Sequence, residues 1–320
     1  MMIRNMINRL SLVLGLFKEF TSDFIGYAKY NIDGWKTPQK ERLISRMLLT
    51  AHSLEKGMSF EKKKKNWGEA KALSLCDMVN RYEKYGVDEY LALALNVLYK
   101  YSIDSYSSKN EKLIKNILCL VEKYSSLLKP DDYGTKQVGE PPVFNEALIK
   151  EFFKTRSSVR FYKDKDVSED DIRQAYDLAK LTPSACNRQT CKVYVYRNID
   201  IKNRILDNQL GNQGWADKAP VLFVVTSDIS RFGGTYEHSQ ALIDGGLFAM
   251  NFAWGLHLKH IGACFKMYIR EHNRTEEFRK ICSIPANEIP IVLILAGYYD
   301  DKPISCPMSH RFDQQIIFNE

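Results

Sequence analysis

Two short segments combine residue types that suit the binding of an anion and of a planar ring. Residues 156–160, Arg-Ser-Ser-Val-Arg, place two arginines four positions apart around a pair of hydroxyls. Such guanidinium groups suit phosphate, which they bind through charge-assisted, bidentate hydrogen bonds. The arginines lie one turn apart if the segment is helical, or reach one side of an irregular loop. Residues 183–189, Pro-Ser-Ala-Cys-Asn-Arg-Gln, add hydroxyls and carboxamides, the donors and acceptors that hold a planar heterocycle by its edge.

Other chemistry-bearing patterns are absent or incomplete. The sequence contains no G-x-G-x-x-G, G-x-x-x-x-G-K-[ST], G-x-S-x-G or H-E-x-x-H. His257 and His260 lie three positions apart, but no third ligand accompanies them, which favours two polar positions on a mostly buried helix. Cys186 and Cys191 have four residues between them and no second pair, so we interpret them as core thiols rather than zinc ligands. We predict no metal site.

Composition indicates a globular chain of about two domains. The 320 residues carry a net charge of +7, and residues 1–150 hold 24 Lys and Arg against 18 Asp and Glu, a net charge of +6. The run Lys62–Lys65 favours a solvated loop or helix end. A weak contact with an acidic membrane surface stays open, whereas no nucleic-acid motif accompanies the charge. The seven scattered cysteines predict free thiols in a cytoplasmic protein.

The pattern of apolar residues divides the chain in two. Residues 1–130 follow helical spacing, with an amphipathic first helix in place of a signal peptide and with Gly57 as the C-cap of a second helix. Breaks at 129–143 predict a linker, so we expect a helical domain with its linker at 1–143 and a second domain at 144–320. In the second domain we predict strands at 192–196, 220–226, 262–268 and 289–297. We predict helices there at 145–155, 168–181 (with Ser168 as N-cap and Asp171 three residues on), 202–210, 239–259 and 275–282.

The order of these motifs resembles the nitroreductase superfamily of FMN-dependent oxidoreductases. The similarity rests on RSSVRFY, on TPSACNRQ and on the C-terminal SHRF, and covers residues of about 145–320. It implies an α+β fold with a central mixed or antiparallel sheet flanked by helices, here with an all-helical N-terminal domain. It also implies a homodimer with FMN at the interface, and hydride transfer from NADH or NADPH through the flavin to an unknown small organic acceptor. The alternative is a flavin-binding or partner-binding module without significant redox turnover.

The resemblance also assigns site residues. Arg156 and Arg311 would hold the FMN phosphate, with Ser157 and Ser158 on the phosphate or ribityl chain. Arg160 would lie near the pyrimidine end of the ring. Pro183, Ser184, Asn187 and Gln189 would contact the isoalloxazine edge, and Lys266 or Met267 would present a backbone N–H near the reactive nitrogen. Flavin would carry the chemistry, so no catalytic side chain is assigned.

Three departures from the family pattern accompany this resemblance. Relatives often read N-x-Q-P-W where this chain has Thr190 and Cys191 after the glutamine, and Ser309 replaces a basic residue two positions before the last arginine. The N-terminal phrase AHSLEKGMSF places His52 and Glu55 at a helix end. They form either a polar pair that caps the helix or part of a segment that closes over the flavin pocket or recognises a particular substrate.

Overall fold

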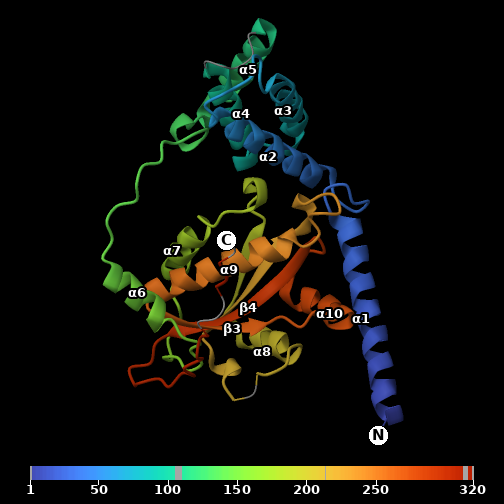
Figure 1. The fold of residues 1–320 in the computed structure, drawn as a ribbon, viewed down its shortest axis with the longest axis vertical. Helices are drawn as coiled ribbons and strands as arrows, with labels where there is room; N and C mark the ends of the chain where they lie inside the picture. Colours follow the sequence, from blue (N-terminus) through green and yellow to red (C-terminus); the bar gives the residue numbers. More distant parts are fainter. Residues whose placement is uncertain (1, 105–109, 213, 313–315, 319–320) are drawn as a thin grey trace.

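The computed structural model describes residues 2–104, 110–212, 214–312 and 316–318. Before the linker, the described chain forms helices (Figure 1), with short 3₁₀ turns at 83–85, 125–127 and 130–132. The helices are α1 (Met2–Tyr30), α2 (Gln39–Met58), α3 (Glu69–Tyr82), α4 (Glu89–Ile103) and α5 (Glu111–Lys123).

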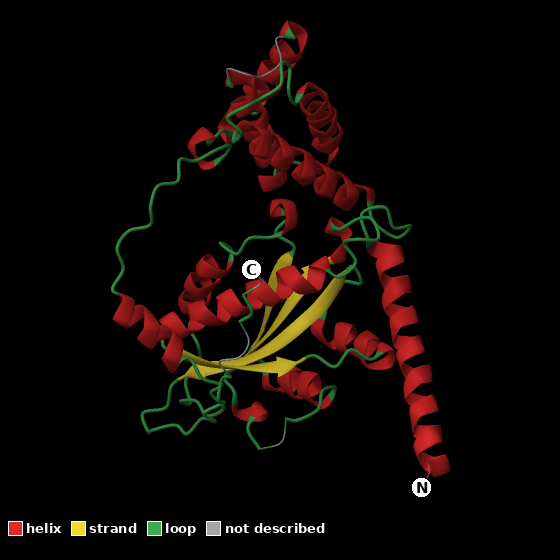
Figure 2. Cartoon of the chain, in the orientation of Figure 1, coloured by secondary structure: helices red, strands yellow, loops and turns green. Residues whose placement is uncertain are grey.

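The part of the chain after the linker alternates helices and strands (Figure 2). Its helices are α6 (Glu146–Thr155), α7 (Glu169–Ala179), α8 (Ile199–Asp207), α9 (Gln240–Leu258) and α10 (His272–Cys282). Its strands are β1 (Cys191–Tyr196), β2 (Val221–Asp228), β3 (Ile261–Met267) and β4 (Glu288–Tyr298). They form an antiparallel sheet in the order β1-β2-β4-β3, which leaves β3 at an edge. Short 3₁₀ turns η4 (Ala185–Asn187), η5 (Ala216–Lys218) and η6 (Ile229–Arg231) connect these elements.

The sheet is covered by helices on both faces, which explains the unbroken apolar run of β2. Successive side chains of a strand point to opposite faces. Val221, Phe223 and Val225 belong to the core under α7 and α9, whereas Leu222 and Val224 belong to the core with α8 and α10. All eight residues of β2 are buried because both faces are covered.

The helical part has its own core and is joined to the sheet through α2. Buried side chains of α2, α3, α4 and α5 form one apolar cluster. On α2, the Ser45 hydroxyl donates to the Ser230 carbonyl at 3.0 Å, and Glu41 pairs with Arg231 at 2.8 Å. The Ile32 N–H donates to the Phe232 carbonyl at 2.8 Å. The segment after β2 is therefore one of the places where the helical part is attached to the rest of the chain.

The structure confirms the predicted α+β fold with a helical N-terminal part. The four strands lie where the sequence places them, and the Ser168 hydroxyl accepts from the Asp171 N–H at 3.1 Å, as an N-cap does. α3 was not singled out by the sequence, and α8 begins and ends earlier than predicted. No helix among the described residues is long and apolar enough to cross a bilayer.

Two local predictions need correction. Gly57 is not the C-cap, since α2 continues to Met58; instead, a Cβ on Gly57 would lie 2.2 Å from Cζ3 of Trp67. The glycine therefore permits close packing rather than a left-handed turn. The lysine run is not solvated throughout: Lys63 is paired with Asp104 at 2.8 Å, and its side chain is only 8% exposed.

Candidate functional site

The Arg-Ser-Ser-Val-Arg segment meets the free edge of β3 through one residue. Ser158 forms a parallel bridge to Ala263, and the Val159 N–H donates to the Ala263 carbonyl at 3.1 Å. Val159 is buried, and its side chain occupies the space beside Gly262. The segment is not helical. Apart from this one bridge it is irregular, and the Val159 N–H also lies 3.1 Å from the Ser157 carbonyl, as in a tight turn.

These residues gather around one thiol on β3. Burial raises the pKa of Cys264, while the positive charges of Arg160, Lys266 and Arg156 and a hydrogen bond with Ser158 act to lower it. The structure thus places four predicted site residues, Arg156, Ser158, Arg160 and Lys266, within electrostatic or hydrogen-bonding reach of the same thiol.

The three cations of this group have no carboxylate partner in the described ranges of the chain. The Arg156 guanidinium lies 6.0 Å from the Trp254 ring centroid, and that of Arg160 lies 5.4 Å from the Trp215 ring centroid. Lys266 is only 8% exposed, and burial lowers its pKa. These cations are half-buried or buried, so water solvates their charge poorly, and no carboxylate among the described residues neutralises it. The electrostatic potential at this edge of β3 is therefore strongly positive.

The second predicted segment is a loop of unusual backbone. Cys186, Asn187 and Gln189 have φ values of 52°, 52° and 49°, in the left-handed region. Such conformations cost free energy in non-glycine residues and are concentrated at functional sites. The loop buries Arg188 and Thr190 and leaves Asn187 and Gln189 exposed. The two exposed carboxamides have no hydrogen-bond partner in the part of the chain that the structure describes, so they are free to contact a ligand.

Two carboxylates, the half-buried Glu237 and the buried Asp244, hold this loop, and sequence reasoning missed both. Glu237 accepts from both terminal nitrogens of Arg188, at 2.9 and 2.5 Å. Asp244, at the start of α9, accepts from the Ala185 N–H at 3.1 Å and from Gln240 at 2.8 Å. A lone acid at the start of an apolar helix was the available signal for Asp244. The pairing of Arg188 with Glu237, 49 residues away, left no local signal.

The departure from the family pattern after Gln189 is accommodated by packing. Thr190 is buried, and its hydroxyl lies 2.8 Å from that of Ser227. Cys191 begins β1, and burial raises the pKa of its thiol to about 11. Both residues contribute to the seam between loop and sheet. Cys186, by contrast, lies in the loop itself and is only half-buried.

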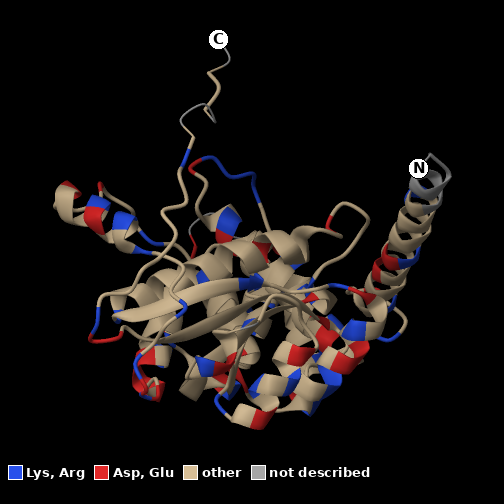
Figure 3. Ribbon diagram, turned by 90° about the horizontal axis from the view of Figure 1, so that it is seen from below, with Lys and Arg blue, Asp and Glu red and all other residues tan. Residues whose placement is uncertain are grey.

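The remaining predicted residues lie outside the cation group. Ser157 is half-buried, and Pro183 and Met267 are exposed, Met267 by 77%. Ser184 is half-buried, and its hydroxyl accepts from the N–H of Gln189 at 3.0 Å. The described structure does not bring Arg311 to Arg156. Arg311 is exposed in a C-terminal segment that leaves the body of the molecule (Figure 3) and donates to the Ser309 carbonyl.

The two predicted segments contact opposite ends of α9. The loop touches α9 through Asp244, whereas Arg156 lies over Trp254, ten residues further along the helix. At 1.5 Å per residue the two contacts are about 15 Å apart along the helix axis. Near the loop end of α9, the helix exposes the apolar side chains Leu242, Ile243 and Leu247. An apolar helix face of this kind is usually covered by another surface.

The helical part reaches the loop through α2, which contacts η4 as well as η6. His52 lies on this helix; burial lowers the pKa of its imidazole, and the charges of Lys56 and Arg188 lower it further. Burial raises the pKa of Glu55, which accepts from the Gly134 N–H at 3.2 Å. Glu55 thus fixes the start of the linker to α2, while His52 lies within electrostatic reach of the loop.

His257 and His260 do not face each other as metal ligands. His257 is on α9, with Nε2 3.1 Å from the Thr155 hydroxyl and 3.2 Å from the Phe152 carbonyl. Its Nδ1 lies 3.4 Å from the Tyr299 hydroxyl. His260 is exposed beyond the helix end, at a φ of 56°. The described residues contain no group of three His, Cys, Asp or Glu side chains placed to hold a metal ion.

Comparison with known proteins points to one family. Residues 153–213 match the model of the Nitroreductase family, and this range contains both predicted segments. A candidate NADH dehydrogenase/NAD(P)H nitroreductase from Methanothermobacter thermautotrophicus is 29% identical over 157 residues, which span 48% of this chain and 79% of that protein.

Two solved structures are also similar to this chain. An FMN-dependent nitroreductase from Clostridium difficile is 20% identical, with a TM-score of 0.45, over 53% of this chain and 98% of its own. A candidate nitroreductase from Desulfovibrio desulfuricans, solved in complex with FMN, is 20% identical, with a TM-score of 0.45, over 56% of this chain and 98% of its own. The family match and the curated relative confirm the resemblance of the C-terminal half of this chain to the nitroreductase family.

Proposed function

We propose that this protein is an FMN-dependent oxidoreductase that passes hydride from NADH or NADPH, through the flavin, to a small organic acceptor. In this proposal residues 144–320 form the flavin-binding domain, and residues 1–143 form a helical domain and linker. The observation that carries the proposal is the group of cations at the β3 edge, for which the described residues supply no carboxylate partner. The match to the Nitroreductase family over residues 153–213 supports it.

The β3 edge fits the phosphate of FMN. Arg156 and Arg160, whose charges both act on Cys264, would donate paired hydrogen bonds to the phosphate or to the nearby ring, and the Ser158 hydroxyl would add another. Lys266 carries a further positive charge on the same edge. An anion would relieve the cost of leaving these cations without counter-ions. A cation held near the pyrimidine end would also stabilise the negative charge of reduced flavin.

The loop fits the edge of the isoalloxazine ring. Its backbone turns the Asn187 and Gln189 carboxamides outward while the Arg188 side chain anchors it from within. Carboxamides can donate and accept at once, which matches the alternating donors and acceptors of the pyrimidine ring. Ser184 and Pro183 would complete this contact, and the exposed β3 edge near Met267 would supply a backbone N–H.

A homodimer would unite the two segments. If α9 of one subunit packs against α9 of a second copy about a two-fold axis, the helices run antiparallel, and the loop end of one lies beside the Arg156 end of the other. The exposed apolar side chains Leu242, Ile243 and Leu247 would be buried at that contact. Each FMN would then contact both subunits. We also propose that Arg311 reaches the phosphate in this dimer.

The chemistry divides between cofactor and protein. When bound, FMN would supply the hydride-accepting and hydride-donating ring for nicotinamide and acceptor. The protein would bind the phosphate through Arg156, orient the ring through the loop, and place the charge of Arg160 beside it. No side chain needs to transfer a proton in this scheme, and we assign none as a catalytic acid or base.

The experiment compares two flavins and two arginines. Arg156→Ala removes a charge-assisted hydrogen bond, so FMN should bind about 10–150-fold more weakly. Riboflavin, which has no phosphate, should bind with unchanged affinity. Arg173→Ala, at a helix surface where the arginine is 78% exposed, is the matched control and should leave both affinities unchanged. Fluorescence titration measures the affinity of each of the two variants for each of the two flavins.

The outcomes separate the parts of the proposal. Unchanged FMN affinity in Arg156→Ala would remove the phosphate assignment, and a protein that never takes up FMN would remove the function. Anaerobic bleaching of the bound flavin by NADH or NADPH should follow if the protein is an enzyme. A bound flavin that neither nucleotide bleaches would indicate a binding module instead.

A further inference from the structure

The first helix has two unlike faces, and its polar face is docked on the molecule's own α10. The Ser22 hydroxyl lies 2.8 Å from Nδ1 of His272, and the His272 N–H donates to Glu19 at 2.8 Å. Asp23 pairs with Arg270 at 3.5 Å. These contacts involve exposed polar groups, so they orient α1 without burying an apolar surface.

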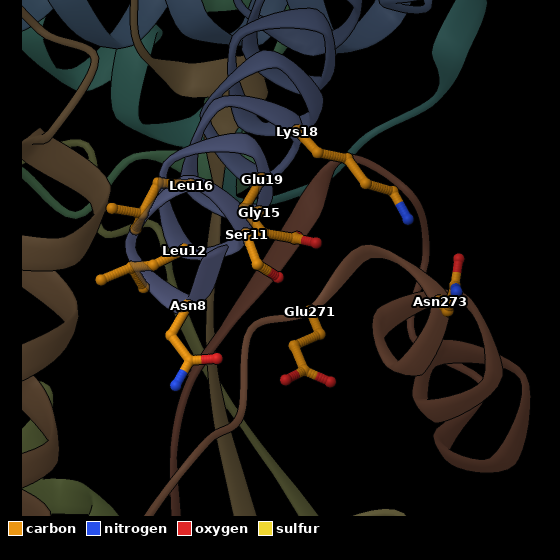
Figure 4. A pocket seen from close by; sticks show the side chains of 9 residues that line it. All are labelled: Asn8, Ser11, Leu12, Gly15, Leu16, Lys18, Glu19, Glu271 and Asn273. Carbon is orange, nitrogen blue, oxygen red and sulfur yellow. The ribbon is translucent and has the colours of Figure 1, made fainter. Parts of the chain in front are cut away.

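Toward its N-terminus, the same polar face borders an open groove (Figure 4). The groove has a volume of about 600 Å³ and lies between α1 and the start of α10. The side chains that line it are mixed in polarity: Asn8, Ser11, Leu12, Gly15, Leu16, Lys18 and Glu19 from α1, and Glu271 and Asn273 at the start of α10. The polar groups on this side of α1 therefore face the groove and the rest of the chain, with Leu12 and Leu16 beside them.

The opposite face of α1 is apolar and uncovered. Five side chains recur there at alternating spacings of three and four residues, and each is 59–71% exposed: Leu10, Val13, Phe17, Phe20 and Phe24. At 100° per residue these positions fall on one side of the helix, away from Glu19 and Ser22. A contiguous apolar surface of this size marks an interaction site. We name these five residues the α1 stripe.

The residues that flank the α1 stripe argue against pairing with a second α1. Two-stranded coiled coils place complementary charges beside the apolar seam, and these select the partner. Here Leu14 and Leu16 flank the stripe and are themselves 61% and 47% exposed. Three of the five stripe residues are phenylalanine, in place of the Leu, Ile and Val typical of such seams. The apolar arc is therefore too broad and too bulky for a paired helix.

Charge favours a lipid surface. Residues 1–18 contain three basic residues and no acidic one. Helices that lie in the membrane interface combine a Phe- and Leu-rich face with basic residues, and anionic lipids attract them by about 1 kcal/mol for each cation near the surface. The position of α1 also suits a flat surface, because it lies at the edge of the molecule, with the body on one side of it (Figures 1 and 3).

We propose that α1 binds the interface of an anionic lipid membrane through the α1 stripe, with α10 and the sheet held on the water side. Insertion to the depth of the ring side chains buries the stripe, while the groove face remains hydrated. This inference does not depend on flavin binding.

The test is co-sedimentation of the full-length protein with vesicles. We expect the protein to sediment with phosphatidylcholine vesicles that contain about a third phosphatidylglycerol, and about tenfold less with phosphatidylcholine alone or in high salt. Phe17→Ser/Phe20→Ser should reduce the partition coefficient for the anionic vesicles at least about tenfold, since two large apolar side chains no longer insert. Leu73→Ser/Leu118→Ser is the matched control, because both leucines are exposed, by 46%, on other helices of the same part of the chain. It should bind as the wild type does.

Each outcome decides the proposal. Equal sedimentation of the Phe17→Ser/Phe20→Ser variant and the wild type overturns it, as does a wild type that stays in solution with anionic vesicles. An oligomer that is present without lipid and dissociates in the phenylalanine variant also overturns it, because a second copy would then cover the stripe. Circular dichroism confirms that the variants are folded, and Lys18→Gln, which keeps the stripe intact, should weaken binding to anionic vesicles only.

Discussion

Replacing Glu237 with alanine would test how the buried ion pair holds the candidate ring-binding loop. The Arg188 side chain is only 1% exposed, and Glu237 is its carboxylate partner. Arg188 also donates to the carbonyls of Ala185 and Arg231, so its position is fixed by the loop itself. Removal of the carboxylate would leave a guanidinium in the interior with two backbone acceptors and no counter-ion.

The magnitude follows from this burial. Breaking a buried pair by removing one partner typically costs about 3–5 kcal/mol, mainly because a charge stays buried and uncompensated. The pair Glu169–Arg173 is the control: its side chains are 73% and 78% exposed, and their nearest atoms are 3.8 Å apart. Exposed pairs contribute about 0–1 kcal/mol. We therefore expect Glu237→Ala to destabilise the protein several-fold more than Glu169→Ala.

Urea unfolding followed by circular dichroism and tryptophan fluorescence measures both variants. The urea concentration at the midpoint of unfolding should fall markedly for Glu237→Ala and stay within error of the wild type for Glu169→Ala. The dependence of the unfolding free energy on urea concentration should be the same for both variants. FMN affinity should also decrease in Glu237→Ala, because the loop that carries Asn187 and Gln189 loses its anchor. Equal midpoints for the two variants would show that the ion pair does not hold the loop.

Two further predictions concern the helices. Gly57→Ala should destabilise the helical part by about 1–3 kcal/mol, since the new Cβ must displace the Trp67 ring. Gly26→Ala, with open space around it, should be neutral or stabilising. Thermal unfolding compares the two variants, and equal melting temperatures would contradict the packing argument. Hydrogen bonds from Tyr298 and Ser168 lower the pKa of Asp171, so its contribution to stability is present above the ordinary Asp pKa of about 3.9 and is lost as the pH falls through the lower, folded value. The melting temperatures of wild type and Asp171→Asn should therefore differ at pH 7 and converge below about pH 4; a constant difference would refute this.

The main elements of the fold follow from local patterns. The apolar run of β2 predicts a strand covered on both faces, and the Ser168–Asp171 spacing predicts a helix start, because both depend on neighbours in the chain. The prediction that Gly57 is a C-cap was wrong because a glycine near a helix end suits either a left-handed cap or a close packing contact. Only the position of Trp67, ten residues away, decides between these.

The candidate site was predictable in residue type and not in geometry. The sequence predicts that Arg156 and Arg160 form an anion-binding pair, but their placement beside β3 depends on the bridge between Ser158 and Ala263. The role of Lys266 as a third cation depends on the same edge. The placement of Arg311 stays a prediction, since the described chain does not bring it to this group.

The sequence by itself determines the division into a helical part and an α+β part, the position of each strand, and the residue types of the two site segments. These depend on periodicity and on short spacings, which act within a few residues. Only the tertiary structure shows that Arg188 is buried against Glu237, that three cations lie at one strand edge with no carboxylate partner among the described residues, and that α1 turns its polar face inward. These depend on contacts between residues far apart in the chain, whose free energies no local pattern records.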